Sequence, residues 1–296
     1  MMPVIATGTR QLVALKKHTV MKTILIATDF SDAAHNASLY GVELAKAFNA
    51  RVILFCAYQQ VPVPITETPV LTLEEMSIRT QRQLEMEAKA INKRETVILE
   101  TIHKEGTATS SILEAAKQNN ADIIITGMKG SGKNLRKVFG STASALAAKS
   151  TIPLIVVPEE AQFSRIDTIA LANESDIEPD ADVHLLDALR EIAEIFQPKL
   201  YLVRIAQTRF REAFEILNRP FKLIRLMQSF DPVYESIEGR DIPKALNQFI
   251  ESYHVNMLAM LAHKHSLPER WFIKSTTRSM VFESHIPLLI LPDRPA

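Results

Sequence analysis

Short apolar runs alternate with longer segments of helical periodicity along most of this chain. In the first half, the apolar runs are rich in β-branched residues, as buried strands of parallel sheets are. The expected strands are Lys22–Thr28, Arg51–Ala57, Val97–Ile102, Asp122–Thr126 and Leu154–Val157, and the expected helices are Asp32–Phe48, Leu73–Arg94, Ile112–Gln118 and Ser141–Lys149. Strands that alternate with helices predict a parallel α/β sheet with right-handed crossovers.

The second half repeats this plan. Its expected strands are Thr168–Ala172, Leu200–Ile205, Val233–Ile237, Met257–Leu261 and Pro287–Pro292, with helices at Asp180–Phe196, about Thr208–Ser229, and Ile242–Tyr253. The closing segments Thr151–Pro158 and His285–Pro292 match closely at a constant offset. We therefore expect an extension at 1–20 followed by two similar domains, 21–158 and 159–296, each a five-stranded parallel sheet flanked by helices.

Composition narrows the range of functions. Lys and Arg together number 34, as do Asp and Glu, so no net field draws the protein to nucleic acid or an acidic membrane. No apolar run is long enough to cross a bilayer, and residues 1–20 have no continuous signal-peptide core. The single cysteine, Cys56, cannot form an internal disulfide, which suits a reducing compartment. We expect a cytoplasmic protein.

The most informative stretch is glycine-rich and runs from Ile123 to Thr142. It holds four of the eight glycines and has the order strand, loop, helix start. Glycines let backbone amides approach an anion closely, and a helix N-terminus favours negative charge. Ser141 or Thr142 is expected to cap the helix and bond the same anion. Lys129 either steers phosphate or belongs to a solvated basic face.

The spacing of Gly127, Gly130, Gly140 and Ser141 completes a wider pattern, with Ile-Ala-Thr-Asp-Phe-Ser at residues 26–31 and Pro-Leu-Ile-Val-Val-Pro at residues 153–158. Together these motifs resemble the universal stress protein family in its tandem form. The resemblance implies two tandem Rossmann-like domains of the adenine nucleotide alpha hydrolase-like type. It also implies that they pair as an internal pseudo-dimer through their last strands, Leu154–Val157 and Leu288–Leu291.

The same resemblance implies an ATP site in the first domain, with magnesium held by the phosphates. The glycines and Ser141 would hold ribose and phosphates, Thr28 and Asp29 would lie near the base and ribose, and Ala57 would offer its backbone to adenine. A carboxylate accepts hydrogen bonds from ribose hydroxyls but repels phosphate, so Asp29 belongs at the base end. The expected set is Thr28, Asp29, Ala57, Gly127, Lys129, Gly130, Gly140, Ser141 and Thr142.

Simpler interpretations compete at this site. Asp29 would also serve as a cap for the first helix, and the glycines would also permit a tight surface loop. Residues 127–134 nearly match a P-loop, but Asn134 stands where a hydroxyl must hold magnesium, which disfavours a P-loop NTPase. His35 and His103 have no partner at metal-ligand spacing, so no metal site made of side chains is expected.

The second half departs from the binding pattern. With the two closing segments aligned, Leu261, Lys264 and Lys274 stand opposite the three site glycines. Asp29 corresponds to Glu174 or, with a one-residue slip, to Asn173. Side chains there occupy positions at which the backbone must approach a ligand, so ATP is expected in the first domain only.

Three functions follow from this picture. The first is a nucleotide-responsive stress regulator that binds ATP and hydrolyses it slowly or not at all, because the sequence places no base for water and no phosphoryl-transfer set. The second is a nucleotide-free interaction or scaffold protein of the same fold, and the third a slow ATPase or phosphotransferase. Further pairing into a homodimer is compatible with each.

Overall fold

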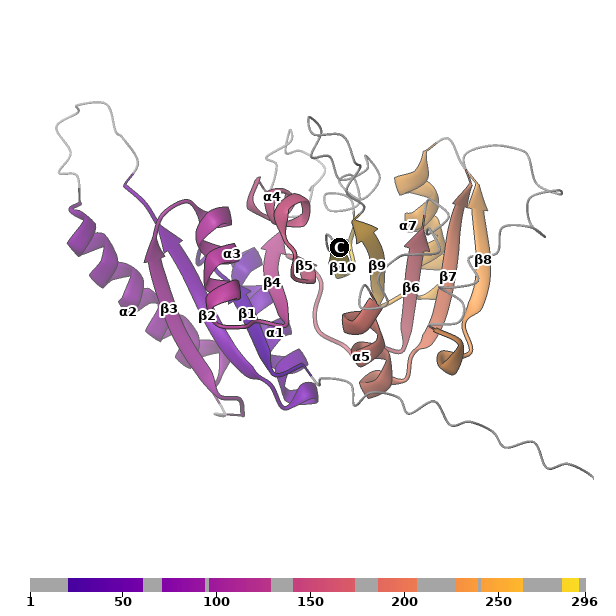
Figure 1. The fold of residues 1–296 in the computed structure, drawn as a ribbon, viewed down its shortest axis with the longest axis horizontal. Helices are drawn as coiled ribbons and strands as arrows, with labels where there is room; N and C mark the ends of the chain where they lie inside the picture. Colours follow the sequence, from indigo (N-terminus) through magenta and orange to yellow (C-terminus); the bar gives the residue numbers. More distant parts are fainter. Residues whose placement is uncertain are drawn as a thin grey trace, which may run out of the picture.

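The computed structural model describes residues 21–60, 71–93, 96–128, 141–173, 186–206, 227–238, 241–262 and 284–292. These residues form one ten-stranded sheet in the order β3-β2-β1-β4-β5-β10-β9-β6-β7-β8, covered by helices on both faces (Figure 1). The first five strands come from the first half of the chain and the last five from the second. The two halves repeat one strand order about the centre of the sheet.

The elements of the first half alternate as the sequence predicts. In chain order they are β1 (Thr23–Ala27), α1 (Asp32–Phe48), β2 (Arg51–Tyr58), α2 (Leu73–Ile91), β3 (Leu99–Glu105), α3 (Ala108–Gln118), β4 (Ile123–Met128), α4 (Ser141–Lys149) and β5 (Leu154–Pro158). All neighbouring strands within this half are parallel.

The described elements of the second half follow the same plan. They are β6 (Thr168–Asn173), α5 (Asp187–Phe196), β7 (Lys199–Ala206), the short 3₁₀ helix η2 (Gln228–Phe230), β8 (Val233–Glu238), α7 (Ile242–Tyr253), β9 (Met257–Ala262) and β10 (Leu288–Pro292). Most of the helix expected at about 208–229, and the start of the one expected from 180, lie outside the described residues.

The two halves join through β5 and β10. These strands are antiparallel, with Leu154 opposite Ile290, Ile155 opposite Leu289 and Val156 opposite Leu288. The pairing confirms the expected pseudo-dimer through the last strand of each half.

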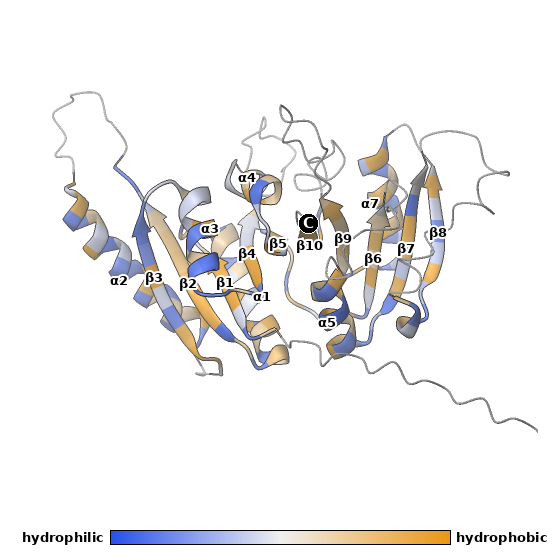
Figure 2. Ribbon diagram, in the orientation of Figure 1, coloured by the Kyte–Doolittle hydropathy of each residue, from blue (hydrophilic) through white to orange (hydrophobic). Residues whose placement is uncertain are grey.

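Two hydrophobic cores lie on opposite faces of this sheet and extend across both halves. Along β1, Ile24 and Ile26 face one core while Leu25 and Ala27 face the other. The first core also contains residues of α1, α2 and α5, and the second contains residues of α3, α4 and α7. Figure 2 shows the central strands as the most hydrophobic part of the molecule, which fits strands buried on both faces.

Matching hydrogen bonds show how closely the halves repeat. Asp122 Oδ2 accepts from the amide of Thr23 at 2.9 Å, and Asn256 Oδ1 accepts from the amide of Thr168 at the same distance. In both halves, the side chain that precedes the fourth strand therefore fixes the start of the first. An acceptor oxygen is common to Asp122 and Asn256 and the negative charge is not, so the oxygen performs this structural role.

Some boundaries differ from the sequence prediction. α2 ends at Ile91, and the expected end at Arg94 lies outside the described residues. α3 begins at Ala108, after the N-cap residue Thr107, four residues before the predicted start at Ile112. β4 continues through Gly127 to Met128 and does not end at Thr126, so Gly127 lies in the strand.

Candidate functional site

The candidate site lies at the carboxyl ends of β1 and β4. β1 is flanked by β2 on one side and β4 on the other. The connection from β1 to β2 therefore runs toward one side of the sheet, and the connection from β3 to β4 runs toward the other. Such a switch point is where open α/β sheets generally bind ligands. Thr28 and Asp29 follow β1 directly, and Gly127 lies near the end of β4.

The segment after β1 holds Asp29 outward. Thr28 is buried, its amide donates to the Phe55 carbonyl at 2.8 Å, and its Oγ1 accepts from the Phe30 amide at 3.0 Å. Phe30 has a φ of 65°, an uncommon left-handed conformation for an aromatic residue. Asp29 is exposed, and its Oδ1 accepts from the Ser31 amide at 3.0 Å. The turn thus fixes an exposed carboxylate at the sheet edge.

Ser31, not Asp29, caps helix α1. The Ser31 hydroxyl accepts from the Ala34 amide at 3.3 Å, and its backbone is extended as in other N-caps. The alternative in which Asp29 caps the first helix is therefore wrong. The second carboxylate oxygen of Asp29 forms no hydrogen bond with the residues that the structure describes.

Gly127 has a packing role that does not depend on any ligand. A Cβ at this position would lie 2.5 Å from the carbonyl carbon of Ala33 and 2.8 Å from the Ala34 nitrogen. Real Cβ atoms do not approach backbone this closely. The first turn of α1 can therefore rest on β4 only because residue 127 has no side chain.

Ala57 lies near the end of β2, next to β1, and is partly exposed. Its neighbour Cys56 is buried, and burial together with the nearby Asp29 carboxylate raises the pKa of the thiol to about 12. Cys56 is thus an uncharged apolar residue beneath the site, because both burial and a negative neighbour disfavour the thiolate.

Three further side chains at the ends of β2, β3 and the start of α2 were not singled out as a group from the sequence. The Oγ of Ser77 and Nε2 of His103 lie 3.0 Å apart, and the rings of Tyr58 and His103 are 5.8 Å apart at 35°. Strand periodicity relates Tyr58 to His103, because Cys56 is the register partner of His103 and Tyr58 lies two residues beyond Cys56 on the same face. The contact with Ser77 depends on how α2 packs and is not visible in a local pattern.

The structure brings Thr28, Asp29, Ala57 and Gly127 to one edge of the sheet. α4 begins at Ser141, and Thr142 is partly buried in its first turn. Lys129, Gly130 and Gly140 lie outside the described residues. Among the described residues, no group of three His, Cys, Asp or Glu side chains is arranged to hold a metal ion.

The register of the second half identifies its equivalent positions. Gly127 pairs with Val157, and Leu261 pairs with Leu291 in the same way. Leu261 is buried, so a side chain fills the position at which the first half has none. By the same registers Asn173 is the equivalent of Thr28, which makes Glu174 the equivalent of Asp29. Glu174, Lys264 and Lys274 lie outside the described residues.

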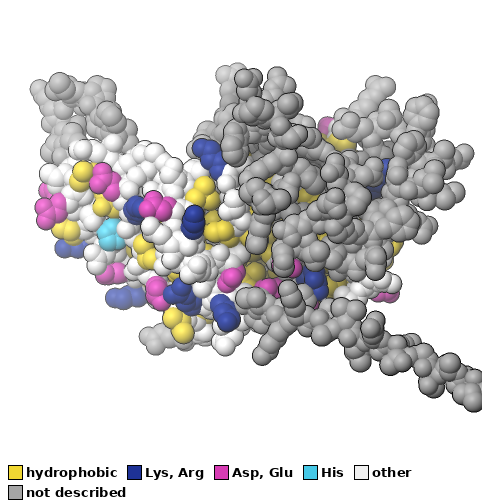
Figure 3. All heavy atoms as spheres, viewed as in Figure 1, with side chains coloured by type: hydrophobic (Ala, Val, Ile, Leu, Met, Phe, Trp, Pro, Cys, Tyr) yellow, Lys and Arg dark blue, Asp and Glu magenta, His cyan; other side chains and the backbone are white. Residues whose placement is uncertain are grey.

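The described surface carries both acidic and basic side chains. Figure 3 shows acidic and basic side chains interspersed over the described part of the face in view. Lys104 forms an ion pair with Glu114 at 2.5 Å, which joins the end of β3 to α3. None of the described helices is both long enough and apolar enough to cross a bilayer.

Two α/β halves joined at their last strands, with a switch-point edge in each, define the class of protein. The family model described as "Universal stress protein family" matches residues 21–158 and 172–292. The chain therefore belongs to the universal stress protein family, as a tandem member with two such domains.

Individual relatives agree with this assignment. A universal stress protein of Thermus aquaticus is 30% identical over 138 residues, which cover 47% of this chain and 99% of that protein. One from Mycobacterium tuberculosis is 31% identical over 140 residues, 46% of this chain and 48% of that protein. The crystal structure of a universal stress protein from Archaeoglobus fulgidus superimposes with a TM-score of 0.73 at 15% identity, covering 93% of this chain and 99% of that one. At this identity the structural match shows the shared fold alone.

Proposed function

We propose that the first domain binds ATP at the carboxyl edge of β1 and β4, and that the protein acts as a nucleotide-responsive regulator. One observation carries the proposal. Asp29 is an exposed carboxylate held by a hydrogen-bonded turn at the switch point, beside the first turn of α1. The equivalent edge of the second half has Leu261 in place of Gly127, which supports a site in the first domain only.

Each residue of the proposed site has a role that its chemistry permits. Asp29 accepts from the ribose hydroxyls, and the Ala57 backbone meets the adenine edge. The glycine segment and the start of α4 contact the phosphates, with Lys129, Gly130, Gly140, Ser141 and Thr142 as the contributing residues. Magnesium would be held by the phosphates and would neutralise part of their negative charge.

The regulatory part of the proposal rests on helix α1. Its first turn packs against Gly127, and one turn later the Asn36 side chain donates to the carbonyls of Pro158 and Ala161 at 3.0 and 2.8 Å. These carbonyls belong to the segment that leads from the first half into the second. A ligand that prefers one position of α1 would therefore shift the connection between the halves.

Asp29→Ala gives the direct test, with Asp32→Ala as a matched control. Both residues are exposed acids near the start of α1, so the two variants change the net charge equally. In calorimetric titrations we expect saturable ATP binding by the wild type, about 10-fold or more weaker binding by Asp29→Ala, and unchanged binding by the control. No saturable binding by the wild type would overturn the proposal.

A scaffold function that uses no nucleotide is favoured by a different observation, the continuous sheet and shared cores between the halves. Acid extraction of purified protein distinguishes the two functions, because only a nucleotide binder releases adenine absorbance. Steady ADP production with magnesium that Asp29→Ala abolishes would instead assign the site to a slow ATPase.

A further inference from the structure

Helix α2 exposes several large hydrophobic side chains among charged ones. Among the nine large hydrophobic residues that the structure describes as exposed, Leu71, Leu73, Ile78 and Met86 lie on α2 or just before it, with 41%, 38%, 44% and 71% of their surface accessible. α2 stands at the end of the molecule remote from the second half, and Figure 2 shows hydrophobic positions between hydrophilic ones along it. Exposed apolar groups gathered on one element mark interaction surfaces.

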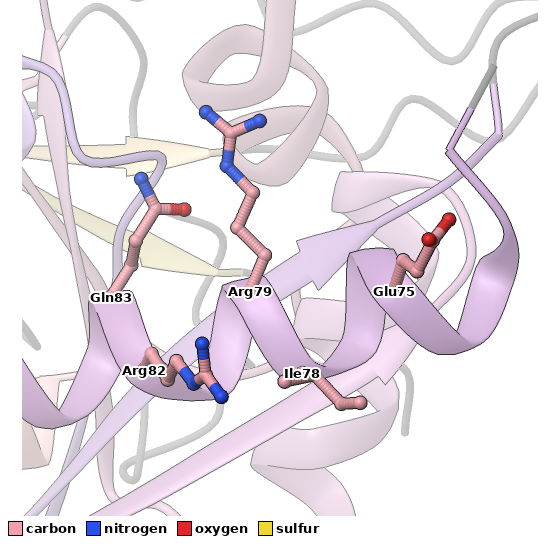
Figure 4. A pocket seen from close by; sticks show the side chains of 5 residues that line it. All are labelled: Glu75, Ile78, Arg79, Arg82 and Gln83. Carbon is pink, nitrogen blue, oxygen red and sulfur yellow. The ribbon is translucent and has the colours of Figure 1, made fainter. Parts of the chain in front are cut away.

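A groove of about 300 Å³ runs along this surface, lined by Glu75, Ile78, Arg79, Arg82 and Gln83. Figure 4 shows Glu75, Arg79 and Gln83 on one side of the helix and Ile78 and Arg82 on the other. Both sets are rows of residues four apart, so the groove lies between two helix ridges. A ridge from another helix fits such a groove.

The charges of the groove are divided along its length. Glu75 lies in the first turn, where its Oε2 accepts from the Thr72 amide at 2.8 Å in the capping box. Arg79 and Arg82 follow one and two turns later, and neither forms an ion pair with the residues that the structure describes. One end of the groove therefore offers a carboxylate and the other an unpaired guanidinium.

This arrangement is its own complement when the helix is reversed. A twofold axis between residues 78 and 79 sets Glu75 opposite Arg82 of the partner subunit. Ile78 and Arg79 then lie beside the axis. A twofold interface needs a patch of this kind, because the same residues must supply both sides.

We propose that a second copy of this chain docks on α2, so that the two α2 helices pack antiparallel in a homodimer. The carboxylate of Glu75 and the guanidinium of Arg82 in each chain form two symmetry-related ion pairs, and Ile78 between them is buried. A single helix pair buries less than the roughly 1,200 Å² of a standard interface. The dimer is therefore a weak one whose population depends on protein concentration.

Sedimentation velocity over a concentration series tests this proposal. We expect the wild type to shift from monomer toward dimer as concentration rises, and Arg82→Glu to remain monomeric over the same range. Arg165→Glu is the matched control, since it changes the net charge equally at an exposed site in the segment between the halves. This control should dimerise as the wild type does.

Charge complementation tests the antiparallel geometry itself. Glu75→Arg and Arg82→Glu each place like charges opposite one another in their own homodimers, whereas a mixture of the two variants restores both ion pairs. We expect each variant alone to be monomeric and the mixture to form dimers. Because Glu75→Arg also removes a capping partner, Glu75→Gln, which retains an acceptor oxygen, serves as a second variant with weakened dimerisation and an intact helix signal in circular dichroism.

Three results would overturn the proposal. They are a wild type that stays monomeric at every concentration, an Arg82→Glu variant that dimerises normally, and a mixture that fails to recover dimers. Flotation with phosphatidylserine vesicles that depends on both arginines, in the absence of dimers, would assign the groove to a membrane surface instead.

Discussion

Gly127 on β4 and Ala33 on α1 approach so closely that a single added methyl group at residue 127 would lie 2.5 Å from the Ala33 carbonyl carbon. The contact joins the strand to the first helical turn at the edge where we place the nucleotide. A glycine of the proposed binding motif is thus required by packing before any ligand is considered. Loss of binding in a Gly127 variant therefore does not by itself identify a ligand contact.

We expect Gly127→Ala to lower the free energy of unfolding by about 1–3 kcal/mol, because α1 must shift away from β4 to admit the new Cβ. Urea unfolding followed by circular dichroism measures this effect. Thr142→Val is a useful contrast, since it alters the proposed phosphate side of the site without adding volume. It should weaken ATP binding and leave the unfolding midpoint unchanged. Equal stability of Gly127→Ala and wild type would contradict the tight contact.

Cys56 should resist thiol reagents in the folded protein. Its pKa of about 12, against an ordinary value of 9.0, makes the thiolate fraction about 1,000-fold smaller at pH 8. We expect very slow reaction with a chromogenic disulfide reagent under native conditions and full reaction of the single cysteine in urea. Asp29→Asn removes a negative neighbour, so it should lower the thiol pKa and speed native labelling. Fast labelling of native wild type would show that Cys56 is accessible.

Glu191 on α5 should make stability depend on pH. Its Oε2 accepts from the Met21 amide at 2.7 Å, which joins the second half to the start of the first. Burial, with the neighbouring acids Asp122, Asp187 and Glu194, raises the pKa of Glu191 from 4.5 to about 7, although the Met21 hydrogen bond opposes this. The folded state therefore binds more protons than the unfolded state between these values, and this group lowers stability as pH rises from about 4.5 to 7.

Glu191→Gln should remove that contribution while keeping an oxygen acceptor for the Met21 amide. Because Glu191 is only half-buried, we expect the free energy of unfolding of the variant to exceed that of the wild type by about 1 kcal/mol at pH 8 and by little at pH 4. Thermal unfolding across this pH range measures the difference, and Glu160→Gln, at an exposed acid, is the control. A variant less stable than wild type at pH 8 would show that the charged form is favourable.

Much of the fold follows from periodicity in the sequence. The bounds of α7 match the predicted helix, and β9 differs from the predicted strand by one residue, because each is determined within one segment. The pairing of β5 with β10 was expected from the resemblance to the family, and the repeated closing segments identify these two strands as equivalent. Periodicity was enough for the single elements, whereas the pairing between the halves needed the resemblance.

The site was less predictable because its contacts join distant segments. The sequence predicts that Gly127 follows the strand in a loop. In the structure it lies in β4 and packs against α1, a helix that starts almost a hundred residues earlier. The nearness of Asp29 to Cys56 likewise depends on the order of strands in the sheet. Alignment of the closing segments placed Leu261 opposite Gly127, and the strand register confirms that Leu261 occupies this position in the second half.

Asn36 should control access to the segment between the halves. Its side chain donates to two carbonyls of that segment, which is also held by Phe163 between Tyr40 and Phe196, with ring centroids 5.0 and 6.3 Å apart. Asn36→Ala removes both hydrogen bonds and should lower the free energy of unfolding by about 1–3 kcal/mol. We expect faster tryptic cleavage after the exposed Arg165, compared with wild type and with Gln81→Ala as the surface control.

The same assay connects the segment to the proposed ATP site. If ATP favours one position of α1, saturating ATP should slow cleavage after Arg165 in the wild type, because Asn36 lies one turn beyond the start of that helix. In Asn36→Ala the nucleotide should still bind and no longer protect. Protection that persists without the Asn36 side chain would mean that the halves communicate by another route, such as the β5–β10 pairing. An ATP-bound wild type that is cleaved as fast as the free protein would separate nucleotide binding from any change in this connection.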